Sequence, residues 1–262
     1  MSAEIPALVG MTFRENQSSI QEFLKIMCYS AQASFLTAAT LAPIGIYCMN
    51  AALKRHPRLW PVATVPLGFA VQQAMEGVIW TSLNHNNSAT AETAARVYLF
   101  FAICWWPFWG PLSALVAATE PCKKRILSAI LLLSSGWFFY YYLPMLVEFN
   151  HQIQATIVHH SIRYAYSDSV ILGGSNRVPM TILYLLFTAG PFFIQNVGDR
   201  SWVPIFIGFS SVFAAHYFAT HAYTSVWCIF AALLSSYCMV FFRRLDRCFL
   251  PELKNCIIPS AA

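Results

Sequence analysis

Apolar residues along this chain come in long runs that are separated by short polar segments. A run of about 20 apolar residues is long enough for an α-helix to cross the hydrocarbon core of a bilayer. The pattern therefore predicts an all-α, polytopic membrane protein, built as a bundle of seven transmembrane helices. These helices are expected at residues 32–53, 60–83, 95–118, 126–148, 179–197, 202–220 and 224–242.

The segments around these runs divide the chain into three parts. Residues 1–26 form a polar N-terminal tail without the apolar run of a signal peptide, and Met27 is a candidate for the true start. Residues 27–242 form the transmembrane domain, and residues 243–262 form a basic cytoplasmic tail. The stretch 150–178 is the only long polar connection between predicted helices.

The amino-acid composition is typical of an integral membrane protein. Of the 262 residues, 58% are hydrophobic and only 10% are charged, whereas a soluble domain is about 25% charged. This balance excludes a soluble globular enzyme, a disordered chain and a nucleic-acid-binding module. The partners to expect are the lipid bilayer and a lipid or small-molecule ligand, with no nucleic acid.

Lysine and arginine are distributed unevenly between the two predicted sides. With the N-terminus outside, the inner segments contain 11 of the 16 Lys and Arg residues. Cytoplasmic loops of membrane proteins are enriched in these residues, so the pattern predicts an outer N-terminus and an inner C-terminus. The second predicted helix then starts inside near Trp60, and Glu76 lies roughly 24 Å along it, in the outer third of the membrane.

Glu76 is the clearest candidate for a functional carboxylate. Burying an ionisable side chain in the hydrocarbon core costs free energy, and such residues usually have a function. Gln72 and Gln73 precede it by four and three residues, so all three side chains can share one helix face. We expect this face to point into the bundle and to bind a ligand. The structural alternative is a protonated Glu76 that joins the glutamines in holding helices together by hydrogen bonds.

Three tryptophans, Trp105, Trp106 and Trp109, lie near mid-membrane in the third predicted helix, around Pro107 and Pro111. The prolines free backbone carbonyls and bend the helix, which is tolerated where neighbours or a cavity satisfy those carbonyls. The rings could line a pocket for a flat or isoprenoid ligand. Packing against neighbouring helices is the commoner role for such rings.

Four motifs between Met27 and about residue 242 resemble, in the same order, those of a bacterial family of uncharacterised multi-pass membrane proteins, a domain of unknown function. They are Met27-Cys28-Tyr29-Ser30-Ala31, the Gln-x-x-Glu-Gly-x-x-Trp segment Gln73 to Trp80, the His-x-x-x-Tyr segment His160 to Tyr164, and Ser225 to Cys228. The resemblance implies a bacterial inner membrane location and no known activity. All four motifs fall on the predicted outer side, where they point to one shared site.

The first hypothesis for this site is a zinc centre with Cys28, Glu76 and His160 as ligands, because sulfur, nitrogen and oxygen donors with one open position suit catalytic zinc. Zinc-bound water could then attack a lipid or small ligand from the outer leaflet. Glu76, His160 and Tyr164 would be the catalytic residues of a metal-dependent membrane hydrolase, and Trp80 would contact the ligand. His216, in the sixth predicted helix, is a further candidate ligand, although it is outside the family pattern and equally suited to packing.

Two other classes of function stay open. The protein could be a transporter or a small-ligand or ion-binding protein in which Glu76 binds a cation, a proton or a small ligand, with a helix break near Pro107. It could also be a structural or partner-binding membrane protein, with an extracytoplasmic disulfide between Cys28 and Cys228.

Overall fold

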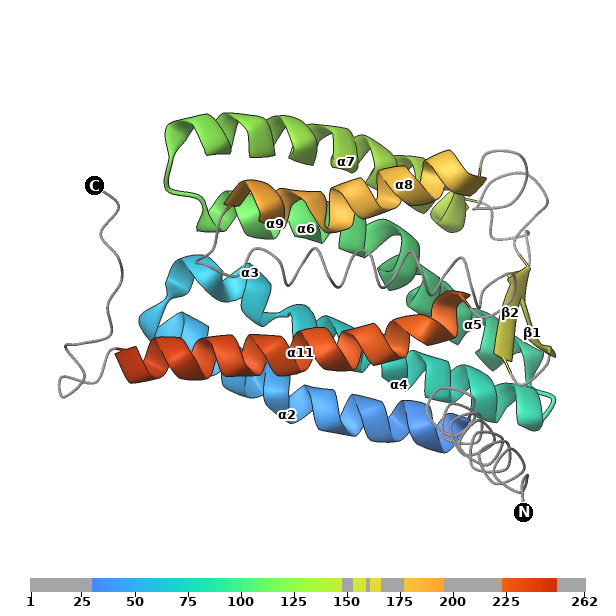
Figure 1. Cartoon of the computed structure of the whole chain (residues 1–262). Helices are drawn as coiled ribbons and strands as arrows, with labels where there is room; N and C mark the ends of the chain where they lie inside the picture. The colour runs from blue at the N-terminus through green and yellow to red at the C-terminus, as the bar shows by residue number, and fades with distance from the viewer. Residues whose placement is uncertain (1–29, 148–152, 159–160, 166–176, 196–222, 249–262) are drawn as a thin grey trace, which may run out of the picture.

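The computed structural model describes residues 30–147, 153–158, 161–165, 177–195 and 223–248, and these form a bundle of helices that run side by side between two ends (Figure 1). Four helical segments of this described part are long and apolar enough to cross a membrane. They are Ala31–Arg55, Pro57–Asn84, Ser88–Ala117 and Pro121–Leu146. They agree in order and position with the first four predicted spans, and they support a multi-pass membrane protein.

The first two spans are α2 (Ala31–Arg55) and α4 (Val65–Asn84), which pack closely and run in opposite directions (Figure 1). They are joined by a 3₁₀ turn (η1, Pro57–Leu59) and a short helix α3 (Trp60–Ala63). A Cβ atom at Gly45 would lie 2.5 Å from the Leu67 side chain and 2.8 Å from its backbone nitrogen. Small residues allow such close approach of helices in membranes, so Gly45 fixes the α2–α4 crossing.

The third span is one continuous rod of three pieces: α5 (Ser88–Leu99), a π-helical segment η2 (Phe100–Trp105) and α6 (Trp106–Ala117). It begins earlier than the predicted residue 95. The first turns of α5 contain several alanines, which favour a helix, and Ser and Thr residues, which interrupt the apolar run. A sharp turn precedes it, with Asn86 at a φ of 55°, a left-handed conformation that asparagine tolerates better than most residues.

Four further helices complete the described part of the bundle. The fourth span belongs to α7 (Pro121–Val147). The fifth predicted span corresponds to α8 (Arg177–Thr188) and α9 (Gly190–Gln195), and the sixth, 202–220, lies outside the described residues. The seventh corresponds to α11 (Tyr223–Cys248), which packs beside α2 and continues as a helix past residue 242, the predicted end of the transmembrane domain.

A small antiparallel sheet, β1 (Gln154–Val158) and β2 (Ser161–Ala165), corrects the all-α prediction. Its register pairs Ala155 with Tyr164, and Figure 1 shows it at the end of the bundle where α4 ends and α5 begins. The sequence 153–157 alternates apolar and polar residues, which is a strand signal that the interpretation of 150–178 as a plain connection overlooks. We call this end of the bundle the hairpin end.

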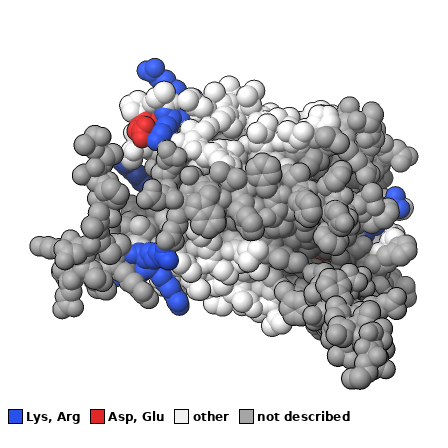
Figure 2. Space-filling view, in the orientation of Figure 1, with Lys and Arg blue, Asp and Glu red and all other residues white. Residues whose placement is uncertain are grey.

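The opposite end, which we call the basic end, gathers most of the described cations (Figure 2). These are Lys54, Arg55, Arg58, Lys123, Lys124, Arg125, Arg243 and Arg244. In the described part of the chain, Arg96, Arg163 and Arg177 belong to elements of the hairpin half. The helices therefore bring together the cations from which an inner C-terminus is predicted, while the orientation itself stays a prediction.

Candidate functional site

Glu76 lies in α4, eight residues before the helix ends at Asn84, which is about 12 Å from the hairpin end. Its side chain is completely buried. At 100° per residue, Gln73, Glu76 and Trp80 lie within about 60° of one another on the helix, and all three are buried. Gln72 is buried as well, so the expectation that the face of Gln72, Gln73 and Glu76 points into the bundle is confirmed.

Gln72 is held by a tryptophan of α6. The indole Nε1–H of Trp106 donates a hydrogen bond of 2.8 Å to Gln72 Oε1 between two buried side chains. The same indole stacks on Phe69, with ring centroids 4.2 Å apart. Gln72 thus has an observed role in joining α4 to α6 next to Glu76, and a ligand contact by its oxygen would compete with this bond.

Three other buried polar atoms lie near the level of Glu76. Gln73 Oε1 and Trp80 Nε1 in α4, and Ser34 Oγ in α2, have no hydrogen-bond partner among the described residues. Ser34 belongs to this level because α2 and α4 are antiparallel and Phe35 packs against Gly77, where a Cβ would lie 2.7 Å from the ring. We call Ser34, Gln73, Glu76 and Trp80 the polar site.

Buried polar groups in proteins nearly always have a partner, so several of them together indicate a ligand, an ion or water. The polar site offers a carboxyl group, an amide oxygen and a hydroxyl oxygen as acceptors, and an indole N–H as a donor. Sequence reasoning missed Ser34. Its signal is a stripe of mainly small buried residues along α2, at 34, 38, 41, 45, 48 and 52, which marks the face that meets α4 and α11.

The three tryptophans of the third span, for which both packing and a ligand pocket are open, lie in one packed cluster. Trp109 Nε1 donates hydrogen bonds to the Pro61 carbonyl at 2.9 Å and to Thr64 Oγ1 at 3.1 Å. Thr64 lies 12 residues before Glu76 in the sequence, toward the basic end. Trp105 is half-buried and stacks on Trp109, with centroids 4.5 Å apart. These contacts favour the packing interpretation, and a ligand at these rings stays a prediction.

The π-helical segment explains how the third span tolerates its prolines. In η2, the Trp106 N–H bonds to Phe101 O, five residues back. This bond takes the regular partner of Ala102 O, and Pro107, the regular partner of Ile103 O, has no N–H. Two consecutive carbonyls are therefore free inside an apolar core.

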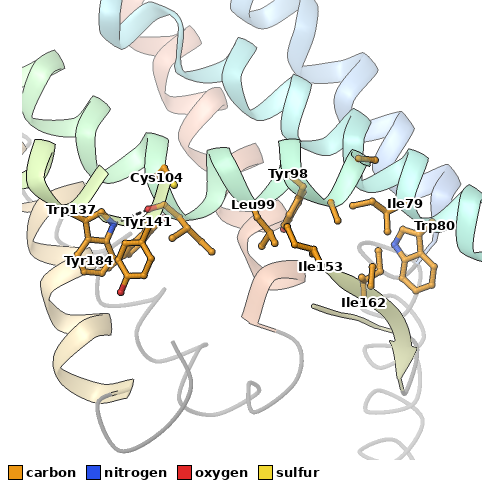
Figure 3. Packing of buried hydrophobic residues seen from close by; sticks show 14 of the residues in the cluster. Ile79, Trp80, Tyr98, Leu99, Cys104, Trp137, Tyr141, Ile153, Ile162 and Tyr184 are labelled. Atoms are coloured by element: carbon orange, nitrogen blue, oxygen red, sulfur yellow. Dashed lines mark hydrogen bonds between the residues drawn. The ribbon is translucent and has the colours of Figure 1, made fainter. Parts of the chain in front are cut away.

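Side chains of two other helices satisfy these carbonyls. Tyr184 of α8 donates its hydroxyl to Ala102 O at 2.8 Å, and Trp137 of α7 donates its indole N–H to Ile103 O at 2.9 Å. Figure 3 shows both aromatic side chains beside Cys104 of the third span. The expectation that neighbours satisfy the freed carbonyls is confirmed here. Nothing in the sequence around Trp137 or Tyr184 identifies them as these donors, because the pairing depends on how α7 and α8 pack against α6.

The hairpin brings two residues of the family-like motifs to one end. Tyr164 of β2 is half-buried and stacks on Tyr98 of α5, with centroids 5.2 Å apart and planes 11° apart. Trp80 belongs to the same core cluster, where it lies beside Ile162 of β2 (Figure 3). Trp80 and Tyr164 thus share the hairpin end with Glu76, while a catalytic role for Tyr164 stays a prediction.

Of the four predicted zinc ligands, Glu76 lies within the described residues. Cys28, His160 and His216 lie outside the described residues, and Cys228 lies in α11 with its side chain outside them. Within the described ranges, no group of three or more His, Cys, Asp or Glu residues could hold a metal ion. A zinc centre therefore stays a prediction that rests on Glu76 alone in the described structure.

Residues 27–252 match the profile of a family described as a family of unknown function (DUF6629). Comparisons with curated proteins and with solved structures give no match.

Proposed function

Because the chain belongs to the DUF6629 family, whose function is unknown, we propose a function from its own residues: an integral membrane protein that binds a cation or a small polar ligand at Glu76. The site would open to the outer side in the predicted orientation. The observation that carries this proposal is the burial of Gln73 Oε1 and Ser34 Oγ without a partner among the described residues, at the level of a completely buried carboxyl group.

The donor atoms narrow the class of ligand. Carboxylate, amide and hydroxyl oxygens are hard ligands that suit alkali and alkaline-earth cations or a hydrated proton. A bound cation would also let Glu76 stay ionised, because it offsets the cost of a charge in the hydrocarbon. The Gln72–Trp106 bond supports this role by fixing the neighbouring turn of α4 against α6.

A zinc-dependent membrane hydrolase is the second candidate, and one observation favours it. Strand β1 ends at Val158 and strand β2 begins at Ser161, so the two strands flank His160 in the sequence. Both strands lie at the hairpin end, toward which Glu76 lies in α4. The sulfur, oxygen and nitrogen donors of Cys28, Glu76 and His160 suit zinc, which would activate a water molecule for attack on a lipid or small ligand. His216 would be the alternative fourth donor, and Tyr164 would orient the substrate.

Thermal unfolding of the purified full chain in detergent tests the proposal. The midpoint would be measured in choline chloride alone and with added Na⁺, Mg²⁺ or Zn²⁺, for the unchanged protein, Glu76→Gln and the control Glu92→Gln. A ligand at 100 times its dissociation constant stabilises a protein by about 2.7 kcal/mol, which raises the midpoint by several degrees. We expect such a rise for the unchanged protein and the control, and its loss in Glu76→Gln.

The choice of ion separates the two candidates. A rise with Na⁺ or Mg²⁺ supports the cation-binding protein, whereas a rise with Zn²⁺ alone, together with stoichiometric zinc in the purified protein, supports the metal enzyme. An equal rise in Glu76→Gln would place the ion elsewhere. The absence of any ion-dependent rise would leave Glu76 as a structural residue and overturn both candidates.

A further inference from the structure

The basic end contains a cluster of cations where two helices finish side by side. Helices α2 and α11 pack against each other, and both run from the hairpin end to the basic end (Figure 1). Cys48 of α2 and Cys238 of α11 are buried in the same core cluster. Six residues further along each helix, about 9 Å, lie Lys54 and Arg244, so these two residues reach the same level.

Lys54, Arg243 and Arg244 are exposed and form what we call the α2–α11 basic patch. The Arg243 guanidinium carbon lies 5.9 Å from the centre of the Tyr47 ring, so a residue of α2 holds an arginine of α11. The only carboxylate among the described side chains of the basic end, Glu120, comes directly before α7 and lies 2.6 Å from Lys123 of that helix. The positive charge of the patch is therefore not neutralised by any described carboxylate.

Below the patch, the same two helices expose apolar side chains. Leu53 of α2 is 60% exposed and Val240 of α11 is 42% exposed. Ile46, about two turns deeper in α2, is also exposed. An anionic phospholipid has a phosphate group above two acyl chains. A cationic cluster directly above exposed apolar residues is complementary to this arrangement.

We propose that the α2–α11 basic patch binds the phosphate of an anionic phospholipid, whose acyl chains lie along Leu53, Ile46 and Val240. Clusters of Lys and Arg next to a transmembrane helix attract anionic headgroups, and Arg matches phosphate oxygens with paired N–H donors. The exposed apolar residues beneath the patch favour a lipid over a soluble anion. They would contact the acyl chains of a lipid, whereas a free phosphate has no group that could reach them.

Native mass spectrometry of the full chain in detergent tests this site. Phosphatidylglycerol and phosphatidylcholine with identical acyl chains would be titrated onto the unchanged protein, onto Arg243→Gln/Arg244→Gln and onto Lys124→Gln/Arg125→Gln. The last variant removes two exposed cations from the same end of the bundle, on α7. We expect the unchanged protein and the α7 variant to bind phosphatidylglycerol about tenfold more tightly than phosphatidylcholine, and the α11 variant to lose this preference.

Several results would overturn the proposal. These are the lack of a preference in the unchanged protein, an equal loss in the α7 variant, and displacement of the lipid by millimolar inorganic phosphate at constant ionic strength. Arg243→Lys/Arg244→Lys keeps the charge and the helix propensity but removes the paired N–H donors, so it should keep only part of the preference. A preference as strong as that of the unchanged protein would contradict the paired contact of arginine with the phosphate.

Discussion

The indole of Trp137 in α7 donates a hydrogen bond of 2.9 Å to the carbonyl oxygen of Ile103 in η2. This carbonyl needs an outside donor because Pro107, four residues later, has no N–H to give it. The indole N–H of Trp137 therefore takes the place of the backbone N–H that would bond to this carbonyl in a regular helix. It also anchors α7 to the point where the π-helical segment meets α6.

This relationship predicts a dependence of Trp137 on Pro107. Trp137→Phe should lower the free energy of unfolding by about 1–3 kcal/mol, because it leaves a buried acceptor unsatisfied. In a Pro107→Ala background the residue at 107 supplies an N–H to Ile103 O, so the same substitution should cost about 1 kcal/mol less. Denaturant titration of the four proteins in mixed micelles measures this coupling.

Trp60→Phe is the control for that cycle. Trp60 is 37% exposed, and its replacement should change the unfolding free energy by less than about 0.5 kcal/mol. Equal costs of Trp137→Phe in both backgrounds would show that packing of the ring, and not its bond to Ile103, stabilises this contact.

Two glycines in neighbouring spans should respond in opposite ways to alanine. A Cβ at Gly110 would lie 2.7 Å from the Thr188 carbonyl oxygen and 3.0 Å from that of Phe187, so Gly110→Ala should push α8 away from α6 and destabilise the fold by about 1–3 kcal/mol. A Cβ at Gly136 in α7 meets nothing within 4 Å. Gly136→Ala should stabilise by about 0.5–1 kcal/mol through helix propensity. Thermal midpoints in one detergent compare the two, and a stable Gly110→Ala protein would contradict the close α6–α8 approach.

The Gln72–Trp106 bond should behave as a coupled pair. Gln72→Leu and Trp106→Phe each leave a polar partner buried without its bond, whereas the double variant removes both partners. The double variant should therefore be more stable than the sum of the single effects by about 0.6–2 kcal/mol, the range found for hydrogen bonds within membranes. Additive effects in a double-mutant cycle would mean that this bond contributes nothing to the position of α4.

The positions of the first four spans follow from hydropathy, because a membrane requires apolar runs of about this length. The inward direction of Glu76 also follows, since a carboxyl group facing lipid would be too costly. The hairpin is harder to find. Its strands are five residues each, and its inward residues, such as Ala155 and Ile162, become buried only because α4 ends and α5 begins beneath them.

Partners from distant helices could not be predicted from this single sequence. Ser34 becomes part of the polar site through the antiparallel register of α2 on α4, and that register depends on small residues such as Gly45. Tyr184 bonds to Ala102, 82 residues away in the sequence, because α8 packs against α6. The missing side chain of Gly110 allows this close approach of the two helices. Such contacts are set by the shapes of facing helices, whereas hydropathy reports only depth.

The orientation of the bundle can be tested by labelling single cysteines in intact cells. Cys122 is exposed at the basic end, and Ala89 is exposed in the first turn of α5 at the hairpin end. In an otherwise cysteine-free background, we expect a membrane-impermeant maleimide to label Ala89→Cys in intact cells and Cys122 only after permeabilisation, because Lys123, Lys124 and Arg125 favour the inner side. Cys104 retained alone is the control, because it is fully buried and should stay unlabelled in both conditions. Labelling of Cys122 in intact cells would reverse the predicted orientation and move Glu76 to the inner half of the membrane.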